Sequence, residues 1–218
     1  MMIDLHTHTL LSDGELLPSE MVRRAEVAGY EAIGLTDHVD ASNIDFALPR
    51  LVTVCRKINA HWKIVALPGV EITHAPLEEI GALVKYARKN GARVVIVHGE
   101  TVSEPVIPGT NRAGIEAGAD IIAHPGYIKE ADAALAAKRG VLLELTARKS
   151  HSSSNAHVAR AALRAGCGLI LNTDAHSHKD FINDATAARL LSHLGIRGAD
   201  RIAMFKAARK FLPAHRRP

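Results

Sequence analysis

Short apolar segments alternate with longer amphipathic segments along most of this chain. The apolar segments read as β-strands over residues 2–8, 32–36, 63–67, 93–97, 120–123, 141–145 and 168–171. Near-continuous apolar strands that are separated by helices are typical of a parallel sheet covered on both faces. The pattern therefore predicts an α/β fold built from repeated strand–helix units.

We expect helices at approximately residues 18–29, 46–61, 77–90, 111–117, 130–139, 155–165, 179–194 and 200–211. Pro18 suits the first turn of its helix, and Gly29 suits a C-terminal stop. Seven strand–helix units in succession favour a closed barrel, with an open doubly wound sheet as the alternative. No linker or repeat suggests a second domain, so we expect a single domain over residues 1–218.

The composition fits an ordinary globular protein. Of the 218 residues, 47% are hydrophobic and 23% are charged, while only 4% are aromatic, which favours helix-on-sheet packing over a β-sandwich. No apolar segment is long enough to cross a membrane, and no signal peptide is recognisable. Cys55 and Cys167 lie far apart and form no metal or redox motif, so we expect a cytoplasmic protein.

The chain is mildly basic, with a formal net charge of +4. Part of the excess lies near the C-terminus, at Lys206, Arg209, Lys210, Arg216 and Arg217. We expect these residues to form a solvated terminal helix, although such a surface also suits phosphate-bearing ligands.

Histidine is unusually frequent, with 13 residues, and its placement is informative. His6 and His8 end the first strand two residues apart, so both imidazoles point to the same side of that strand. Seven further metal-binding side chains lie at or after the ends of other strands or in the turn after the first. The complete candidate set is His6, His8, Asp13, His38, Glu71, His98, His124, Asp174 and His176.

These nine side chains predict a multinuclear metal centre. The carboxyl ends of the strands converge in a β/α barrel, which is where such barrels build their active sites. Nine ligands are too many for one ion and fit two or three divalent ions that share carboxylates. Mixed imidazole and carboxylate ligands suit zinc, manganese or iron, and the lack of cysteine ligands argues against a closed structural zinc site.

The ordered set of motifs resembles the PHP (polymerase and histidinol phosphatase) superfamily. The segments that carry the resemblance are residues 4–9, 12–14, 35–38, 69–71, 123–126 and 172–176, together with His98. The resemblance implies a distorted seven-stranded (β/α)7 TIM-like barrel and a metal-dependent phosphoesterase, commonly with a trinuclear centre. It implies hydrolysis by a metal-bridging hydroxide.

The resemblance also implies a grouping of the ligands. One ion would take His6, His8, Glu71 and Asp174, and a second would take Glu71, His98 and His124, with Glu71 as the bridge. A third would take Asp13, His38 and His176. Asp13 stands where some relatives have a histidine, which adds negative charge at the third position.

Positive side chains near the strand ends are candidates for binding a substrate phosphate. Arg148 is the first choice because a guanidinium binds phosphate in a fork, and Lys149 and Arg112 are further candidates. Glu144 lies in the one strand without a proposed ligand. It is expected either to orient an imidazole or to form a structural hydrogen bond.

We therefore expect a phosphatase that acts on a small phosphomonoester such as histidinol phosphate. A phosphodiesterase or exonuclease-like PHP module that acts on nucleotides or nucleic-acid ends is the alternative, although scarce aromatics provide few stacking platforms for single strands. A non-phosphate metal hydrolase and a non-catalytic metal-binding interaction protein are further alternatives.

Overall fold

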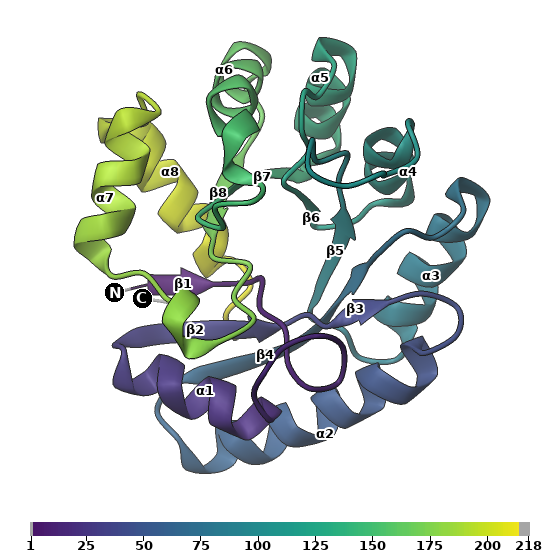
Figure 1. The fold of residues 1–218 in the computed structure, drawn as a ribbon, viewed down its shortest axis with the longest axis vertical. Coiled ribbons are helices and arrows are strands. Elements are labelled where there is room, and N and C mark those ends of the chain that lie inside the picture. The colour runs from purple at the N-terminus through teal and green to yellow at the C-terminus, as the bar shows by residue number, and fades with distance from the viewer. Residues whose placement is uncertain (1, 214–218) are drawn as a thin grey trace.

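The computed structural model describes residues 2–213 and shows a nearly closed parallel β-barrel surrounded by helices (Figure 1). The strands are hydrogen-bonded in the order β1-β2-β4-β5-β6-β7-β8. Their bounds are β1 (Met2–Asp4), β2 (Tyr30–Leu35), β4 (Val65–Ile72), β5 (Val94–His98), β6 (Ile121–Ala123), β7 (Leu142–Thr146) and β8 (Leu169–Asn172). The expected TIM-like α/β barrel is confirmed.

A helix follows most strands and covers the outside of the barrel (Figure 1). The helices are α1 (Pro18–Val27), α2 (Ile44–His61), α3 (Leu77–Lys89), α4 (Thr110–Ala117), α5 (Glu130–Arg139), α6 (Asn155–Ala165), α7 (Asp184–His193) and α8 (Gly198–Arg209). Each of the eight expected helices is present, with ends that differ by a few residues. None of the helices in residues 2–213 is long and apolar enough to cross a membrane.

Two apolar layers explain why these segments pack as a barrel. Side chains such as Val70, Val95 and Val97 pack outward against the helices. Another set, including Leu5, Leu67 and Ile96, forms a separate cluster with Ala208 and Leu212 near the C-terminus. Because every residue of β4 is buried, the strand reads as an apolar run without alternation, as parallel strands do.

Strand β4 continues beyond the residue where the sequence predicts its end. Pro68 and Gly69 usually mark a turn, yet here they lie inside the strand. A Cβ on Gly69 would lie 2.5 Å from the Val94 carbonyl oxygen, so glycine allows β4 and β5 to approach closely. The second half of β4 pairs with β5 and with a short strand, β3 (His38–Val39). This half of β4 places Glu71 at the carboxyl end of the barrel.

The helix expected over residues 179–194 is shorter than predicted. A 3-10 turn, η2 (His178–Asp180), comes first, and α7 begins only at Asp184. The Asn183 side chain accepts a hydrogen bond from the Thr186 amide and caps this helix. A second 3-10 turn, η1 (Ser152–Ser154), precedes α6.

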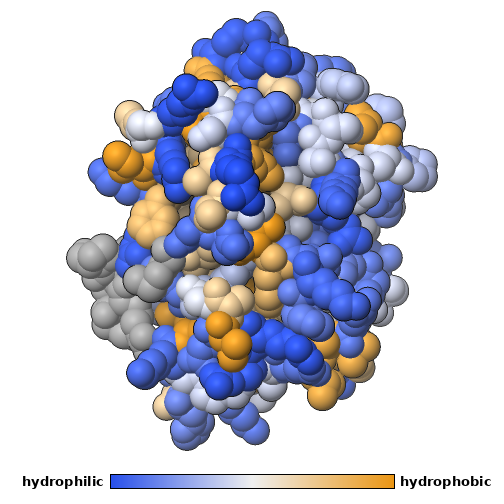
Figure 2. Space-filling model, turned by 60° about the vertical axis from the view of Figure 1, so that its left-hand side comes forward, coloured by the Kyte–Doolittle hydropathy of each residue, from blue (hydrophilic) through white to orange (hydrophobic). Residues whose placement is uncertain are grey.

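The terminal helix α8 lies beside β1 and β8. Its Arg209 forms two contacts of 2.7 Å with the carboxylate of Glu31, so this charge is engaged within the fold. An apolar cavity of about 530 Å³ lies between α7, α8 and the two strands. Figure 2 shows hydrophobic side chains on this side of the molecule. Arg216 and Arg217 lie outside the described residues.

Candidate metal centre

The structure brings all nine predicted side chains together at the carboxyl end of the barrel. Ligand atoms lie within 4.8 Å of one another in three overlapping groups, and Asp174 contacts four of their members, His6, His8, His124 and His176. The groups are His6–His8–Glu71, Glu71–His98–His124 and His8–Asp13–His38–His176. This clustering follows from the parallel sheet, because each strand delivers its last residues to the same end.

The innermost group surrounds the carboxylate of Glu71, which is fully buried. Its Oε2 lies 3.2 Å from Nε2 of His6 and 3.5 Å from Nε2 of His8. The Asp174 carboxylate approaches the same two histidines, with its Oδ1 3.1 Å from Nε2 of His8 and 3.7 Å from Nε2 of His6. Two imidazoles and two carboxylates thus face one point.

The second group lies on the other side of the same carboxylate. Nε2 of His124 lies 3.8 Å from Oε1 of Glu71, and the His98 and His124 rings meet edge to face at 4.5 Å. The Nδ1 of His98 contacts the Gly99 carbonyl oxygen at 3.2 Å. Since a carbonyl only accepts, Nδ1 donates in this contact, so in the neutral ring Nε2 is the nitrogen that can bind a cation.

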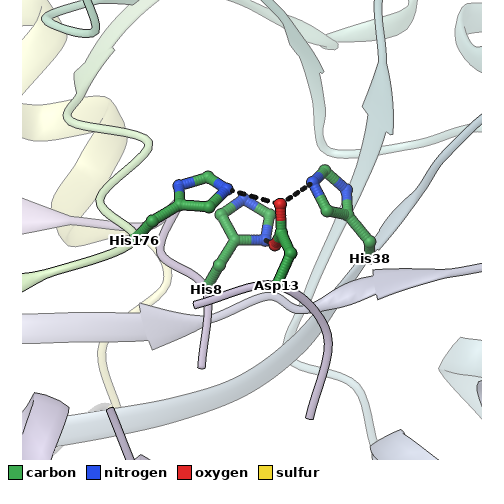
Figure 3. Close-up of side chains that lie close together, drawn as sticks. All are labelled: His8, Asp13, His38 and His176. Carbon is green, nitrogen blue, oxygen red and sulfur yellow. Dashed lines mark hydrogen bonds and ion pairs between the residues drawn. The ribbon is translucent and has the colours of Figure 1, made fainter. Parts of the chain in front are cut away.

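The outer group is more exposed and is drawn in Figure 3. Asp13 Oδ2 lies 3.0 Å from Nε2 of His176 and 3.7 Å from Nε2 of His38. The Asp13 side chain is 54% exposed, whereas Glu71 is buried. A polar cleft of about 380 Å³ opens beside this group. A ligand can therefore reach the centre from the outer side.

Unusual backbone conformations help to turn two of these side chains toward the cluster. His124 has a φ of 25° and Asp174 has a φ of 53°, in the left-handed region that favours glycine. His124 also precedes Pro125, and a residue before proline normally adopts an extended conformation. Strain of this kind is kept where the surrounding structure requires it, most often at functional sites.

Glu144 fixes the orientation of the His6 ring. Its Oε2 accepts a hydrogen bond from Nδ1 of His6 at 2.8 Å and another from the Asn172 side-chain amide at 2.8 Å. Its Oε1 accepts one from the His124 amide at 3.3 Å. Of the two roles that the sequence leaves open, the geometry matches the orienting one, because the contact at Nδ1 turns Nε2 of His6 toward Glu71.

Asp37 holds the loop that carries Asp13. Its carboxylate accepts hydrogen bonds from the Thr9 amide and hydroxyl, both at 2.8 Å, and from the Ser12 hydroxyl at 2.7 Å. Burial raises the pKa of Asp37, and these three donors oppose that rise. The position of Asp13 in the outer group thus depends on the Asp37 carboxylate, which binds Thr9 and Ser12 of the same loop.

The buried charges shift one another's protonation. Burial pushes the pKa of Glu71 upward, but His6 and His38 outweigh this effect and hold it well below its usual value. Burial and the neighbouring His98 lower the pKa of His124 well below its usual value. Burial raises the pKa of Asp174 to about 7, with opposition from His6. These opposed shifts show that negative and positive groups are tightly interleaved.

Several buried polar atoms lack a hydrogen-bond partner within residues 2–213. They include both ring nitrogens of His8, Nε2 of His6 and both carboxylate oxygens of Glu71. Buried polar atoms are normally satisfied, and those left over call for an ion, a water molecule or another explanation. Imidazole nitrogens and carboxylate oxygens that converge in this way fit zinc, manganese or iron.

The predicted phosphate-binding side chains behave differently from one another. Arg148 lies at the cluster, where its Nη1 donates to the Asp174 carbonyl oxygen at 2.9 Å and contacts Nδ1 of His176 at 2.7 Å. Lys149 is exposed on the same loop. Arg112 instead pairs with Asp132 at 2.7 Å and Glu116 at 3.4 Å, so these carboxylates engage its guanidinium.

Two further side chains reach the cluster although the sequence assigns them no role. His151, in the loop after β7, is buried and stacks on His124 with ring centroids 4.3 Å apart. Glu104, in the loop after β5, lies 3.2 Å from Nε2 of His98. Neither residue ends a strand. In the sequence, the only sign of a role is that each is a polar residue in a loop after a relevant strand. Glu104 follows the strand that ends in His98, and His151 follows the strand that contains Glu144.

Comparisons with known proteins show which family this chain resembles. The PHP domain family profile matches residues 4–107. The uncharacterized protein MJ1295 of Methanocaldococcus jannaschii is 41% identical over 192 residues, which cover 87% of this chain and 88% of that protein.

Two solved structures share the fold. Histidinol phosphate phosphatase from Lactococcus lactis, complexed with zinc, histidinol and phosphate, is 18% identical. It has a TM-score of 0.60, with 89% of this chain and 94% of that chain covered. A chain of archaeal ribonuclease P, solved with mature tRNA, is 15% identical with a TM-score of 0.71, covering 95% of this chain and 89% of that chain.

The matched segment contains the His-x-His pair, Asp13, His38, Glu71 and His98, and the remaining candidates follow in the expected order. The relative from Methanocaldococcus jannaschii matches over most of the length of both proteins. This chain therefore belongs to the PHP domain family.

Proposed function

We propose that this protein is a metal-dependent phosphoesterase that hydrolyses a small phosphomonoester at the carboxyl end of its barrel. The observation that carries the proposal is the convergence around Glu71 of buried imidazole and carboxylate atoms that have no hydrogen-bond partner, next to the guanidinium of Arg148. The Lactococcus lactis protein of the same fold is a phosphatase solved with zinc and phosphate, which agrees with this assignment.

The side chains divide among two or three metal positions in this proposal. His6, His8, Glu71 and Asp174 would hold one ion. Glu71, His98 and His124 would hold a second, and Asp13, His38 and His176 a third. When bound, such ions lower the pKa of water toward neutrality and offset the charge of a phosphate group.

The protein itself supplies orientation and charge. Glu71 lies between the first two groups, so one carboxylate can fix their separation. Arg148 is held by the Asp174 carbonyl and His176, and its side chain remains 32% exposed. A guanidinium in this position can bind a phosphate oxygen that enters from the outer cleft. Glu144 keeps the His6 ring in the orientation that this arrangement requires.

The decisive experiment is a substrate panel. Purified protein would be assayed with manganese, zinc or iron on phosphomonoesters, cyclic nucleotides and short oligonucleotides. We expect turnover of monoesters. A preference for oligonucleotides without turnover of monoesters would overturn the proposal, and inactivity across the panel despite full metal loading would favour a metal-binding interaction protein.

A nucleic-acid substrate is the second candidate. The chain of archaeal ribonuclease P with the same fold, in a structure that contains tRNA, favours including this candidate. The oligonucleotide arm of the panel tests it directly. The few aromatic side chains of this protein, 4% of the sequence, provide little stacking surface for single strands and weigh against it.

Glu71 provides a sharp genetic test of the centre. Glu71→Ala removes the carboxylate shared by the first two groups, so we expect hydrolysis to be abolished and bound metal to fall. Metal content by mass spectrometry and initial rates on the best monoester would be measured together. Full activity in Glu71→Ala would exclude the bridging role.

A further inference from the structure

His151 meets the candidate metal centre from a loop that contributes none of the nine predicted ligands. His151 is only 5% exposed. Its ring lies parallel to that of His124, with an interplanar angle of 20° and a centroid distance of 4.3 Å. His151 is thus buried like the inner candidates, although it follows β7 rather than ending a strand.

One ring nitrogen of His151 is held from outside the cluster. Its Nδ1 lies 2.8 Å from the Thr101 hydroxyl oxygen and 2.7 Å from the Ser103 hydroxyl oxygen. Both hydroxyls belong to the loop between β5 and α4. Metal-binding histidines almost always have their second nitrogen fixed in this way, because the bond sets the tautomer and the direction of the ring.

The other ring nitrogen faces the cluster. Nε2 of His151 lies 3.9 Å from Oδ2 of Asp174 and 3.4 Å from Oε1 of Glu104. Nε2 of His124 lies 3.8 Å from the same Asp174 oxygen. His124, His151 and Asp174 each offer one ligand atom, and these three atoms lie within 4.8 Å of one another. Two ligands of one ion, each bound at about 2 Å, can be up to about 4 Å apart, so this spacing is close to that of a shared ion.

His6 and His98 also have one ring nitrogen held from outside and the other directed at a carboxylate. Nδ1 of His6 is bound to Glu144, and Nδ1 of His98 contacts the Gly99 carbonyl, while both Nε2 atoms face carboxylates inside the cluster. His151 repeats this arrangement with hydroxyl groups as the outer partners.

We propose that His151 is a further ligand of this centre, whose Nε2 binds the same ion as His124 and Asp174. Thr101 and Ser103 are its positioning residues. His124 belongs to the second metal position of the proposed function, so His151 would add an imidazole there. Asp174 would then be shared, since its Oδ1 faces His6 and His8 of the first position and its Oδ2 faces His124 and His151. The inference rests on the proposed metal centre, but not on the identity of the substrate.

The test compares metal binding by His151→Ala and His151→Gln with that of the unaltered protein. His61→Ala is the matched control, because His61 is an exposed histidine at the end of α2. Metal content after dialysis, zinc affinity by chelator competition and the visible spectrum of the cobalt(II)-loaded protein would be measured. Circular dichroism of the metal-free proteins identifies any variant that fails to fold.

We expect both His151 variants to lose one ion or to bind it at least tenfold more weakly, with an altered cobalt spectrum. A Thr101→Val and Ser103→Ala double variant keeps the imidazole but frees its ring, so we expect roughly tenfold weaker binding of the same ion. His61→Ala should match the unaltered protein.

Unchanged metal content, affinity and cobalt spectrum in a folded His151 variant would overturn the proposal, even if hydrolysis falls. If His151→Ala fails to fold, His151→Gln and the double variant decide. The proposed function is tested separately. A protein that loses an ion in these variants but hydrolyses no phosphoester supports the ligand assignment and contradicts the phosphoesterase.

Discussion

At the scale of single residues, some histidines of the candidate centre have one ring nitrogen held from outside and the other directed at the cluster, namely His6, His98 and His151. His6 shows this most clearly, with Glu144 on Nδ1 and Glu71 facing Nε2. The Glu144 carboxylate also accepts bonds from Asn172 and from the His124 amide, so it links two ligand-bearing strand ends. Its role is to position other groups, since it lies behind His6.

Glu144→Gln tests this positioning role. The amide can accept with only one of its two terminal atoms, so it cannot keep all three of the present bonds as an acceptor. We expect metal affinity to fall 10- to 100-fold, as is typical when an outer partner of a metal ligand is altered. Chelator competition would measure the effect, and Glu78→Gln, on the exposed surface of α3, is the control. Equal affinity in the two variants would contradict the role.

At the scale of elements, the loop between β5 and α4 forms one wall of the site. It carries Thr101, Ser103 and Glu104, and its ends are joined by Glu100. The Glu100 carboxylate accepts hydrogen bonds from the amides of Gly109 and Asn111, both at 3.0 Å. It therefore binds free amides at the N-terminus of α4, where a negative charge also suits the helix dipole.

Glu100→Ala should loosen this loop without removing a candidate ligand. Loss of a helix N-terminal acceptor typically costs about 1 kcal/mol, so we expect a lower melting temperature and faster amide hydrogen exchange over residues 101–111. Glu100→Gln keeps a carbonyl acceptor and should remain close to the unaltered protein. Exchange rates that do not change in Glu100→Ala would show that other contacts hold the loop.

At the scale of the whole molecule, the barrel closes where its first and last strands meet, through one backbone bridge and several hydrogen bonds from side chains. Thr7 and Ala175 form an isolated parallel bridge. The Leu5 amide donates to the Asn172 side chain at 2.9 Å, and the buried Asp4 carboxylate accepts from the Thr173 amide and hydroxyl. These bonds place the His-x-His segment beside the segment of Asp174 and His176.

Asp4 makes the stability of these contacts between the first and last strands depend on pH. Burial raises its pKa to about 6, against the opposing effect of its hydrogen bonds to Thr173 and His6. The folded state therefore binds a proton more tightly than the unfolded state. The contribution of Asp4 to stability is fully present below about pH 4 and is lost as the pH rises through 6.

Asp4→Asn keeps the shape and an acceptor oxygen but cannot ionise. We expect the metal-free variant to be more stable than the unaltered protein at pH 8, by up to about 3 kcal/mol, and equally stable near pH 4. Urea unfolding at several pH values would measure the difference. A variant that is less stable at pH 8 would show that the ionised carboxylate strengthens the contacts between the first and last strands.

The sequence by itself determined the order of strands and helices and the nine candidate ligands. Parallel strands all end on the same side, so residues such as His6, His98 and Asp174 converge whatever the details of packing. The sequence did not determine the course of β4, because Pro68 and Gly69 are typical turn residues. Only the structure shows that glycine at position 69 lets β4 lie close to the Val94 carbonyl of β5.

Only the tertiary structure decided what the loops contribute. His151 and Glu104 reach the cluster because loop backbones place them there, whereas Arg112 of α4 pairs with Asp132 of α5 because these two helices are neighbours. Loop conformation depends on contacts between distant residues, such as Thr101 with His151, and no short-range pattern in the sequence encodes such contacts. The role of Glu144 likewise became visible only when β7 and β1 were seen side by side with His6 between them.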